Sequence, residues 1–586
     1  ELNEIEPELL DKEEVYKLLK KHNFKCLYCH IDLKEDNWSL DRKNCKKDHT
    51  LDNCVVSCVE CNKSRSDQPF IKFYHESVLK RNNQPAIYII NEENKKVFEL
   101  MKENIVGGPS IIFNRFHEVN GTKIQRVHYD LDKDSWYFDN FGNNVNKIIG
   151  FDANALYLWC IGQPQLCEKL KYIEFNNECN VIESEYYNGT WDTLLNDVQN
   201  EKFFGCVEVD IKVPKSLYEY FSELPPIFVN KTYNSKMAGD VMDDIITNHL
   251  EKKHTTSRKL IATLKTKKIL LKSSLLKWYL DHGLVVKKIY SIIPAKKERL
   301  YKNFEEWVSD SRRLGDLKPE HATKAENAKN IGNSAYGQSI MNKEKHTKVK
   351  IINEEEFNRI KSDFWTGGFE EYETTDGERL FEVHIKKKDV NQNGPEQIGY
   401  GILQDAKLRM LQFYFDCLDK YIDRKDFQLI QMDTDSYYMA LSGKFDDLIK
   451  PNMKEEFELD KNNWFPRTDE VNKAFDKRTP GLFKIEKEGI GMVALCSKSY
   501  YLLTEKDKTD KIACKGGQQK RNDDILNFEN YKRALLDIEL ISGENAGLKY
   551  ENKEMNVYKQ KKILLNPIYV KGVVMEDGIH IHPLVL

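Results

Sequence analysis

Residues 429–441 read Leu-Ile-Gln-Met-Asp-Thr-Asp-Ser-Tyr-Tyr-Met-Ala-Leu, and this stretch decides the fold. Apolar residues flank Asp433-Thr-Asp435-Ser, which predicts a β-hairpin with two buried strands and an acidic turn. Two carboxylates two residues apart repel each other unless a cation holds them together. Mg²⁺ usually takes one or two carboxylates plus phosphates. Because acidic turns are also common in surface loops, the interpretation depends on acids and cations elsewhere in the chain.

The composition indicates a soluble globular protein with several domains. The chain has 586 residues, 40% hydrophobic and 31% charged, with a formal net charge of −4. A surface that binds nucleic acid must therefore be local. No apolar run reaches the roughly 18 residues of a membrane helix, and the N-terminus has no signal-peptide pattern. We expect an intracellular protein, not secreted and without a membrane partner, and a start at Glu1 without Met is typical of a fragment or a processed piece.

Two Cys-x-x-Cys pairs predict one structural Zn²⁺ near the N-terminus. Cys26 and Cys29 form the first pair, and Cys58 and Cys61 form the second. Four thiolates complete a tetrahedral shell and leave no open position. The alternative is four reduced cysteines packed in a core. The rest of the 13 cysteines are scattered, which is typical of metal binding inside the cell and not of a disulfide framework.

The residues around these cysteines resemble the HNH (ββα-metal) endonuclease family, and the matching stretches are 39–44, 53–58 and 61–67. The resemblance implies a treble-clef zinc module over residues 1–75. In that family a His after the Asp is the general base beside the catalytic metal, whereas here Arg42 follows Asp41. His49 is an alternative base, or simply an exposed loop His. We predict that the module binds DNA or supports the fold without cutting.

Two sequence features, a pair of adjacent glycines and a strand that ends in an acid, lie near the start of the larger part of the chain. Ile105-Val-Gly107-Gly108 has adjacent glycines, which permit positive φ and close approach of a backbone or a phosphate. Residues 147–152 read as a buried strand that ends at Asp152 and turns into a helix, so Asp152 and Tyr157 can face one cleft. The alternative is a core strand followed by an ordinary N-cap Asp.

Residues 203–214 alternate like a strand, and residues 251–300 are the basic feature of the chain. The latter hold 14 Lys and Arg against 3 acids. Such a run is usually a solvated face, but four of its lysines are close enough together to follow a phosphate backbone. These are Lys265, Lys267, Lys268 and Lys272.

The residue pattern predicts two helices, over 297–313 and 321–340. Gly315 and Pro319 lie between them and are expected to break the helical pattern. On the second helix, Lys329, Asn333 and Tyr336 share a face. A cation, an amide and a phenol ring on one face suit a nucleoside triphosphate, because its phosphates need charge and its base needs polar contact and stacking.

A helix over 397–423 precedes the hairpin, and a strand pattern follows it. Lys498 and Tyr500 stand two residues apart, so on a strand they share a face, which suits gripping a primer end near the acids. Lys515 is followed by two glycines. The alternative is an edge strand with its polar residues pointing outward.

From about residue 105 to 586 the chain resembles family B DNA polymerases, specifically the protein-primed branch of phages, linear plasmids and Maverick/Polinton-like or virophage-like elements. Five motifs occur in the family order: Ile105–Gly108 as the Y/I-x-G-G loop, Asp152–Tyr157 as motif A, Lys329–Gly337 as motif B, Asp433–Ser436 as motif C and Lys498–Tyr500 as K-x-Y. The resemblance implies addition of dNTPs to a primer 3′ end on a DNA template, in replication of a viral or mobile-element genome. A terminal-protein primer is implied by kinship alone.

The resemblance also implies residue roles. Asp152 and Asp435 would hold two Mg²⁺ (or Mn²⁺) ions, with Asp433 as a secondary acid. Tyr157 would be the steric gate against a 2′-hydroxyl, and Lys329 would neutralise the transferring phosphates. The remaining implied contacts are Asn333 and Tyr336 under the nascent base pair; one further cation among Arg312, Arg313, Lys318 and Lys324; and Gly107, Gly108, Lys498, Tyr500 and Lys515 on DNA.

Two departures from the family pattern stand out. Ala155 and Leu158 replace the Ser and Pro of many relatives, which we expect to alter only local packing. We recognise no exonuclease motif in residues 1–104, where a proofreading domain should precede the glycine loop. Either that domain lies upstream of Glu1, or the protein does not proofread.

The predicted fold is α+β, a right-hand polymerase with palm, fingers and thumb after the zinc module. The boundaries are 1–75 zinc module, 76–150 linker and glycine loop, 151–296 palm with a basic insertion, 297–340 fingers, 341–500 palm and 501–586 thumb. One alternative is an HNH nuclease or DNA-binding protein with a non-functional polymerase region. Another is a non-catalytic binder in which the acids are turn residues.

Overall fold

The computed structural model describes residues 10–70, 73–74, 77, 86–89, 94–139, 141–168, 170–176, 181–363, 365–374, 377–387, 389–392, 394–506, 508–551 and 554–586. The chain divides into two compact units, Glu1–Glu92 with Met341–Asn393, and Glu93–Ile340 with Gly394–Leu586. Residues 341–393, which the sequence assigned to a palm segment 341–500, thus belong to the same compact unit as the N-terminal residues. One reason is that β22 (Asp389–Gln392) pairs in parallel with β3 (Ala86–Ile89).

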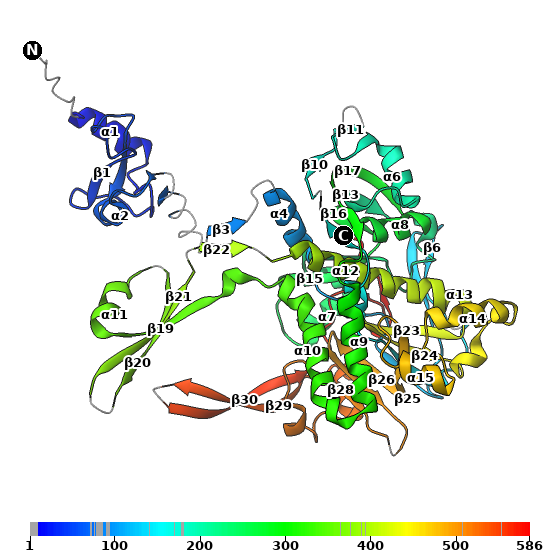
Figure 1. The fold of residues 1–586 in the computed structure, drawn as a ribbon. Helices are drawn as coiled ribbons and strands as arrows, with labels where there is room; N and C mark the ends of the chain where they lie inside the picture. Colours follow the sequence, from blue (N-terminus) through cyan, green and yellow to red (C-terminus); the bar gives the residue numbers. More distant parts are fainter. Residues whose placement is uncertain are drawn as a thin grey trace, which may run out of the picture. The chain divides into compact units, whose positions relative to one another are not determined.

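The larger unit contains a five-stranded sheet, called the central sheet below, in the order β25-β8-β24-β23-β4. Figure 1 labels its strands β23, β24 and β25. β23 (Phe427–Asp433) and β24 (Ser436–Leu441) form the predicted hairpin. Both strands are buried along almost their whole length, which is why they read as unbroken apolar runs. The other strands are β4 (Ser110–Ile112), β8 (Lys147–Ala153) and β25 (Phe483–Gly489).

Helices from distant parts of the chain meet beside this sheet. α12 (Glu396–Gln412) packs against α5 (Leu156–Ile161), α8 (Ser273–Asp281) and α10 (Ala322–Ser339). It continues through a π-helical turn, Phe413–Leu418, into α13 (Asp419–Tyr421). The predicted helix over 397–423 is thus present, with a π-turn inside it.

The predicted helix pair is α9 (Lys302–Leu317) and α10, which pack together. α9 starts later than expected because Lys296–Glu298 forms β18 and pairs with β9 (Gln165–Cys167). Gly315 was expected to break the helix, but it lies inside α9. A Cβ at Gly315 would lie 2.3 Å from Ala325 Cβ, so this glycine permits the close approach of α10. The break comes instead at Pro319, which begins a 3-10 turn.

The segment between α5 and α9 forms a second sheet in the order β10-β17-β13-β16. Its strand β13 confirms the strand expected over 203–214, and α6 and α8 pack together beside it. The elements are β10 (Ile173–Glu174), α6 (Trp191–Gln199), β13 (Gly205–Lys212), β16 (Lys265–Lys272) and β17 (Val285–Pro294), with β14 (Ile227–Asn234) paired to β15 (Thr256–Thr263).

The C-terminal part contains a third sheet, a helix and a long hairpin, followed by a tail that returns to the central sheet. The tail carries Tyr569, whose hydroxyl accepts a bond from Ile112 N at 2.9 Å and donates to Ile112 O at 3.1 Å. The C-terminal tail therefore contacts the central sheet, and the thumb over residues 501–586 stays a prediction. The elements are β5 (Phe116–Glu118), β26 (Gly491–Cys496), β27 (Ser499–Leu503), β28 (Lys511–Ala513), α16 (Phe528–Leu536), the hairpin β29 (Ile541–Glu551) and β30 (Glu554–Leu565), β31 (Val573–Val574) and β32 (Ile581–His582) (Figure 1).

The smaller unit contains the cysteine module and a three-stranded sheet, β19-β21-β20. The module consists of α1 (Lys12–Lys21), β1 (Trp38–Arg42), β2 (Cys54–Cys58) and α2 (Val59–Arg65); the sheet consists of β19 (Thr347–Asn353), α11 (Glu354–Ile360), β20 (Thr366–Glu373) and β21 (Arg379–Lys386). The remaining elements of the larger unit are α4 (Lys95–Asn104), β6 (Val127–Asp130), β7 (Ser135–Phe138), β11 (Val181–Glu183), β12 (Asn188–Thr190), α7 (Asp240–Asp244), α14 (Lys454–Asp460) and α15 (Glu470–Asp476).

Candidate functional site: a carboxylate cluster and a four-cysteine centre

Three predicted acids meet at one end of the central sheet. Asp152 on β8 is the register partner of Ser436 on β24, and Ala153 N donates to Asp435 O at 2.8 Å. Thr434 adopts φ +61° in the turn of the hairpin, and Asp435 N donates to Asp433 O at 2.7 Å. Pairing of two strands that are far apart in the sequence thus brings Asp152 beside the acidic turn.

Burial and mutual repulsion make this cluster unfavourable without a cation. Burial raises the pKa of Asp435 to about 6, and the charges of Asp152 and Asp433 add to the shift. Burial also raises the pKa of Asp152, with Lys484 opposing it. Carboxyls whose charged forms repel each other are typical of sites that hold a metal ion or share a proton.

Two lysines neutralise part of this charge. Lys484 Nζ lies 3.1 Å from Asp152 Oδ2, and Lys498 Nζ lies 2.9 Å from Asp433 Oδ1. Lys484 is the register partner of Asp152 on the edge strand β25, and it was not among the predicted site residues. Only the strand pairing identifies it, because 332 positions separate the two residues in the sequence (484 − 152).

The predicted strand geometry of Lys498 and Tyr500 was wrong. Lys498 adopts φ +62° in the turn between β26 and β27, so it does not share a strand face with Tyr500. Tyr500 lies on β27, is 5% exposed, and its ring packs 5.3 Å from that of Tyr438. The turn conformation is what lets Lys498 reach Asp433.

The adjacent glycines lie directly against the acidic turn. Thr434 N donates to Pro109 O at 2.7 Å. A Cβ at Gly108 would lie 2.4 Å from Thr434 Cγ2, whereas a Cβ at Gly107 would have nothing within 4 Å. Gly108 therefore permits the close packing that holds the turn in place.

Gly108→Ala is expected to destabilise the larger unit by roughly 1–3 kcal/mol, because the added methyl overpacks against Thr434. Thermal melting measures the effect, with Gly107→Ala as the matched control that should leave the melting temperature unchanged. Thr434→Gly removes the clashing side chain and suits the positive φ, so it should rescue Gly108→Ala. Equal melting temperatures for the two single alanine variants would contradict this packing role.

Two predicted tyrosines stack on each other. Tyr157 on α5 and Tyr336 on α10 have ring centroids 4.3 Å apart and planes inclined by 28°. Burial raises the pKa of Tyr157, with Tyr336 and Asp435 adding to the shift, and burial raises the pKa of Tyr336 to about 12. Both hydroxyls therefore stay protonated at physiological pH, and the stack joins α10 to α5.

The other predicted residues of α10 are exposed. Lys329 Nζ lies 3.3 Å from Glu326 Oε1, and its side chain is 45% exposed. Asn333 and Lys324 are also exposed. A cation held only by an exposed ion pair remains available to an anionic ligand, since such pairs contribute little stability.

The candidate cations Arg312, Arg313 and Lys318 differ in the contacts that they make. Arg313 donates to Phe475 O at 3.2 Å and to Thr479 Oγ1 at 3.1 Å, and its guanidinium lies 3.6 Å from the Phe475 ring centroid. It therefore joins α9 to the end of α15. Arg312 is half-buried, and burial with the charge of Arg478 lowers its pKa; Lys318 is exposed.

The basic segment contributes fewer free cations than predicted. Lys272 is 1% exposed and lies 2.6 Å from Asp405 Oδ2, so the expectation that it follows a phosphate backbone was wrong. The side chain is buried because β16 packs against α12 at this point. Lys265, Lys267 and Lys268 are exposed on β16.

Asp435→Asn is expected to stabilise the metal-free protein near neutral pH. Because the pKa of Asp435 rises from 3.8 to about 6 in the fold, the folded state binds the proton more tightly. The free energy of unfolding therefore falls as the pH rises through this window. The variant should gain on the order of 1–3 kcal/mol at neutral pH and nothing below about pH 4. Melting temperatures across this range test the sign, and a variant that melts lower than wild type at neutral pH contradicts it.

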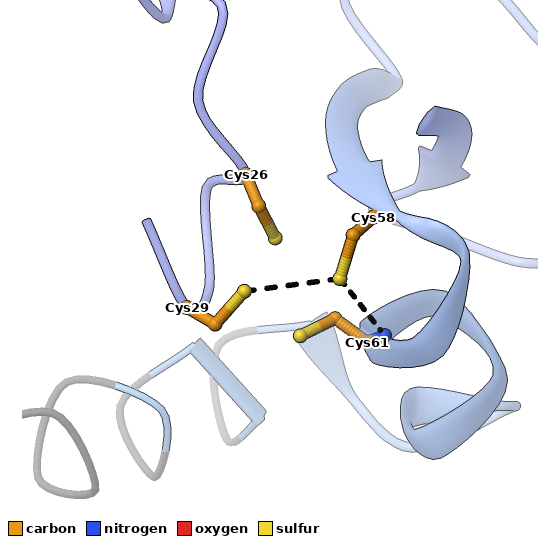
Figure 2. Close-up of side chains that lie close together, drawn as sticks. All are labelled: Cys26, Cys29, Cys58 and Cys61. Atoms are coloured by element: carbon orange, nitrogen blue, oxygen red, sulfur yellow. Dashed lines mark hydrogen bonds between the residues drawn. The ribbon is translucent and has the colours of Figure 1, made fainter. Parts of the chain in front are cut away.

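The four predicted cysteines form a second site (Figure 2). The sulfurs of Cys26, Cys29, Cys58 and Cys61 all lie within 4.8 Å of one another, and in the described part of the chain no other group of three or more His, Cys, Asp or Glu residues does this. Cys58 caps α2 by accepting from Cys61 N at 3.4 Å. A hydrogen bond from the Cys61 thiol lowers the pKa of Cys26 to about 4. Four sulfurs from two turns fit the tetrahedral shell of a structural Zn²⁺.

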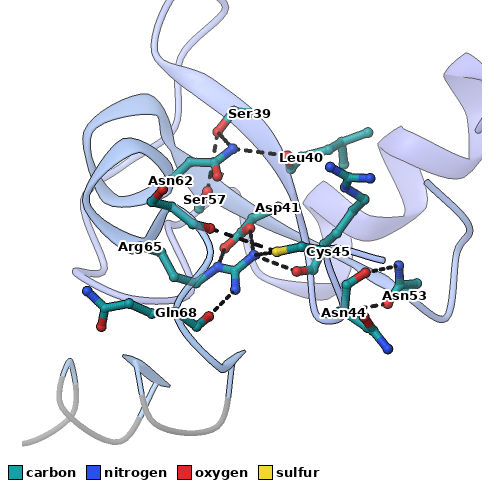
Figure 3. Close-up of polar contacts among 12 residues, drawn as sticks. Ser39, Leu40, Asp41, Asn44, Cys45, Asn53, Ser57, Asn62, Arg65 and Gln68 are labelled. Atoms are coloured by element: carbon teal, nitrogen blue, oxygen red, sulfur yellow. Dashed lines mark hydrogen bonds and ion pairs between the residues drawn. The ribbon is translucent and has the colours of Figure 1, made fainter. Parts of the chain in front are cut away.

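Asp41 and Arg65 form a buried ion pair inside this module (Figure 3). Arg65 Nε and Nη2 donate to the two Asp41 oxygens at 2.6 and 2.5 Å, and Tyr28 Oη donates to Asp41 at 2.5 Å. Both charged side chains are 2% exposed. Arg65 also donates to the backbone oxygens of Arg42 and Gln68, each at 2.6 Å. Because both Asp41 oxygens already accept bonds, this carboxylate could bind a metal ion only by breaking a buried network.

The asparagines that carry the HNH resemblance have structural partners (Figure 3). Asn53 Nδ2 donates to Asp48 O at 2.9 Å, and its Oδ1 accepts from Asn44 N at 3.0 Å. Asn62 Nδ2 donates to Ser39 Oγ at 3.0 Å. Asn53 thereby organises the loop that contains His49, which is half-buried.

A scan against protein-family models finds no match, and no curated protein matches the chain. Among solved structures, the chain is similar to Phi29 DNA polymerase complexed with primer-template DNA (post-translocation binary complex), with a TM-score of 0.41 and 12% identity over 80% of this chain and 62% of that one. It is also similar to the orthorhombic crystal form of Phi29 DNA polymerase, with a TM-score of 0.44 and 12% identity over 94% of this chain and 78% of that one. The chain thus spans about three fifths of the first of these structures.

None of the helices in the described residues combines the length and apolar character needed to cross a membrane.

Proposed function

We propose that this protein is a DNA-templated DNA polymerase that adds dNTPs to a primer 3′ end. The observation that carries the proposal is the register of the central sheet, which sets Asp152 beside the turn of Asp433 and Asp435. Asp152 on β8 and Asp435 in the turn of the hairpin, with raised pKa values and a stacked tyrosine pair next to them, match the needs of nucleotidyl transfer. The order of the five sequence motifs resembles that of the protein-primed family B branch and supports the same proposal.

In this proposal Asp152 and Asp435 hold Mg²⁺ or Mn²⁺, which would acidify the primer hydroxyl and neutralise the triphosphate. The other residues position the reactants. Tyr157, fixed by its stack on Tyr336, limits the space beside the sugar of the nucleotide. Lys329, exposed on α10, neutralises the phosphates.

The remaining proposed contacts follow the same surface. Asn333 and Tyr336 lie under the nascent base pair, and Arg312 and Lys324 are the fingers cations. Lys498 must leave Asp433 to reach a phosphate, so its ion pair is a feature of the DNA-free state. Gly108 and Tyr500 act by holding the turn and the β27 strand in place. Gly107, Lys498 and Lys515, which are exposed, are proposed to contact the primer-template directly, whereas Gly108 and Tyr500 contribute to the DNA surface only through this support.

Primer extension tests the proposal. The full chain is mixed with a labelled primer-template, Mg²⁺ and the four dNTPs, and the products are separated by length. Template-dependent lengthening of the primer supports a polymerase. Binding of the DNA without lengthening, at any metal concentration, would contradict the polymerase and favour the alternatives, which are the non-catalytic binder and the HNH nuclease or DNA-binding protein with a non-functional polymerase region.

Tyr157→Ala is expected to relax the choice of dNTP over rNTP by at least about tenfold, because it removes the steric contact with the 2′-hydroxyl. Single-nucleotide insertion of dCTP and CTP measures the ratio. Tyr290→Ala serves as the tyrosine control, because Tyr290 lies on β17 in the second sheet and not in the sheet that carries the acids. If Tyr157→Ala prefers dCTP over CTP as strongly as wild type does, the assignment of Tyr157 as the steric gate is wrong.

For residues 10–70 we propose a zinc module that binds DNA or supports the fold without cutting it. The buried ion pair between Asp41 and Arg65 favours this function over a nuclease, because the Asp41 carboxylate is already occupied. The next residue is Arg42, where the HNH family has its general-base His. Incubation of the full chain with supercoiled DNA and Mg²⁺ or Mn²⁺ distinguishes the two. Nicking that Asp435→Asn retains and His49→Ala loses would establish the HNH alternative instead.

A further inference from the structure

A cavity of about 540 Å³ lies in the larger unit and is separate from the carboxylate cluster. It is bounded by α5, α6, α8 and α12 and by residues next to β18. Among the described residues that line it, none belongs to the acids or tyrosines of the cluster. Its volume falls within the roughly 300–1,000 Å³ typical of small-molecule sites.

The wall of the cavity is aromatic and includes Trp159, Trp278, Phe203 and Phe204. Trp278 is held by a hydrogen bond from its indole N–H to Asp416 Oδ2 at 3.0 Å and by a stack on His282 with centroids 3.8 Å apart. Trp159 is held by the Arg409 guanidinium, 5.2 Å from its ring centroid. Rings fixed in this way provide a preorganised surface on which a planar aromatic ligand can stack.

The buried end of the cavity is polar. Lys272 Nζ lies 2.6 Å from Asp405 Oδ2 and donates to Pro164 O at 2.8 Å. Ser274 Oγ donates to Asp405 Oδ1 at 3.1 Å. Buried ion pairs contribute little net stability compared with apolar packing. A few convergent polar groups at the end of an apolar cavity are, however, typical of ligand sites.

The mouth of the cavity carries an excess of cations. Lys277 Nζ lies 2.8 Å from Asp281 Oδ2, and Lys297 Nζ lies 2.9 Å from Glu201 Oε2. Arg299 is a third, exposed cation at the same opening. Exposed ion pairs are worth about 1 kcal/mol or less, so the lysines can turn from their acids to an incoming phosphate.

We propose that this cavity binds a nucleotide, with its base against the aromatic wall and its phosphate at the cationic mouth. A stacking surface, hydrogen-bonding groups and phosphate-binding cations are the three elements of nucleotide recognition. The Gln163 and Gln412 side chains, which also line the cavity, offer amide groups to the edge of a base. A free mononucleotide and an unstacked base of single-stranded DNA present the same chemistry. The site does not depend on the polymerase proposal, because it shares no acid with the cluster.

Photocrosslinking tests the proposal with two probes, 8-azido-dATP and a short oligo-dT that carries one 5-iododeoxyuridine. The full chain carries Asp435→Asn, and no divalent cation is added, so that the carboxylate cluster does not compete. Peptide mapping is expected to place the crosslinks in residues 159–164, 203–204 or 273–281. Crosslinking of the azido probe alone identifies a free nucleotide as the ligand, and crosslinking of the oligonucleotide identifies single-stranded DNA; either result supports the site.

Leu408→Trp, which fills the cavity from α12, should lower crosslinking about tenfold, equal to about 1.4 kcal/mol. Because a larger side chain can overpack, the double variant Lys277→Ala/Arg299→Ala at the mouth provides an independent test and should weaken binding at least about threefold. Lys287→Ala, an exposed lysine of β17 outside the cavity, is the matched control. Any of three results would overturn the proposal. Neither probe crosslinks, the crosslinks map outside the cavity, or crosslinking is unchanged in both cavity variants. Primer extension by otherwise wild-type protein fails or succeeds independently of these results.

Discussion

Asp435→Asn is expected to lower primer extension by about 10³-fold or more, because it removes a charged group that is proposed to hold the metal ions of the proposed reaction. The same change should stabilise the metal-free fold, since it ends the repulsion that raises the pKa of Asp435 to about 6. Loss of activity with a gain in stability is a combination that a general folding defect cannot produce. Extension rates at several Mg²⁺ concentrations, beside the melting temperature of each protein, measure both effects.

Asp447→Asn is the matched control, because Asp447 is an exposed acid that follows the same hairpin. It should retain wild-type extension. Asp152→Asn should behave like Asp435→Asn, and Asp433→Asn should lose less activity. Equal extension by wild type and Asp435→Asn would contradict the metal-site assignment. It would also return the acidic turn to the role of an ordinary loop.

Cys58→Ser is expected to abolish zinc binding and to unfold the module of residues 10–70. Structural zinc sites contribute roughly 10 kcal/mol or more of apparent binding free energy, which is also folding free energy for a small module. Cys26 and Cys29 lie after α1, Cys58 ends β2 and Cys61 lies in the first turn of α2, and the buried apolar residues around them are few. Metal analysis of the purified chain should give one zinc per chain in wild type. Limited proteolysis should cut the variant between α1 and α2.

Cys45→Ser is the control for this change. Cys45 Sγ lies 3.3 Å from Arg65 Nη2 and is outside the tetrad, so the variant should keep its zinc. Because the larger unit has its own core, its melting transition should be the same in Cys58→Ser and wild type. A Cys58→Ser protein with a full zinc content would contradict the four-cysteine shell.

Much of the local structure followed from residue order alone. The hairpin of residues 429–441, the strand ending at Asp152 and the helix with Lys329 are all present, because apolar periodicity and turn residues are local signals. Gly315 shows where that reasoning failed. A glycine in a helical pattern reads as a break, but this one makes room for Ala325 of a neighbouring helix. The tertiary contact outweighed the local propensity.

Lys272 and Lys498 show the same limit for charged residues. The sequence places both in basic or motif-like stretches, yet one is buried on Asp405 and the other leaves the strand to reach Asp433. Lys484 was missed for the converse reason. Its ion pair with Asp152 depends on which strand pairs with β8. The sequence of a strand does not by itself specify its partner strand.

The sequence by itself determined the hairpin of residues 429–441, the four candidate zinc ligands and the chemical types of side chain at the site, since spacing and side-chain chemistry are local properties of the chain. Only the tertiary structure decided which acids meet, because β8 and β24 pair across a long separation in sequence. It alone also placed residues 341–393 with the N-terminal unit. It revealed the aromatic cavity between α5 and α8, whose walls come from distant segments. Pairing and packing are properties of the folded chain, and no local pattern contains them.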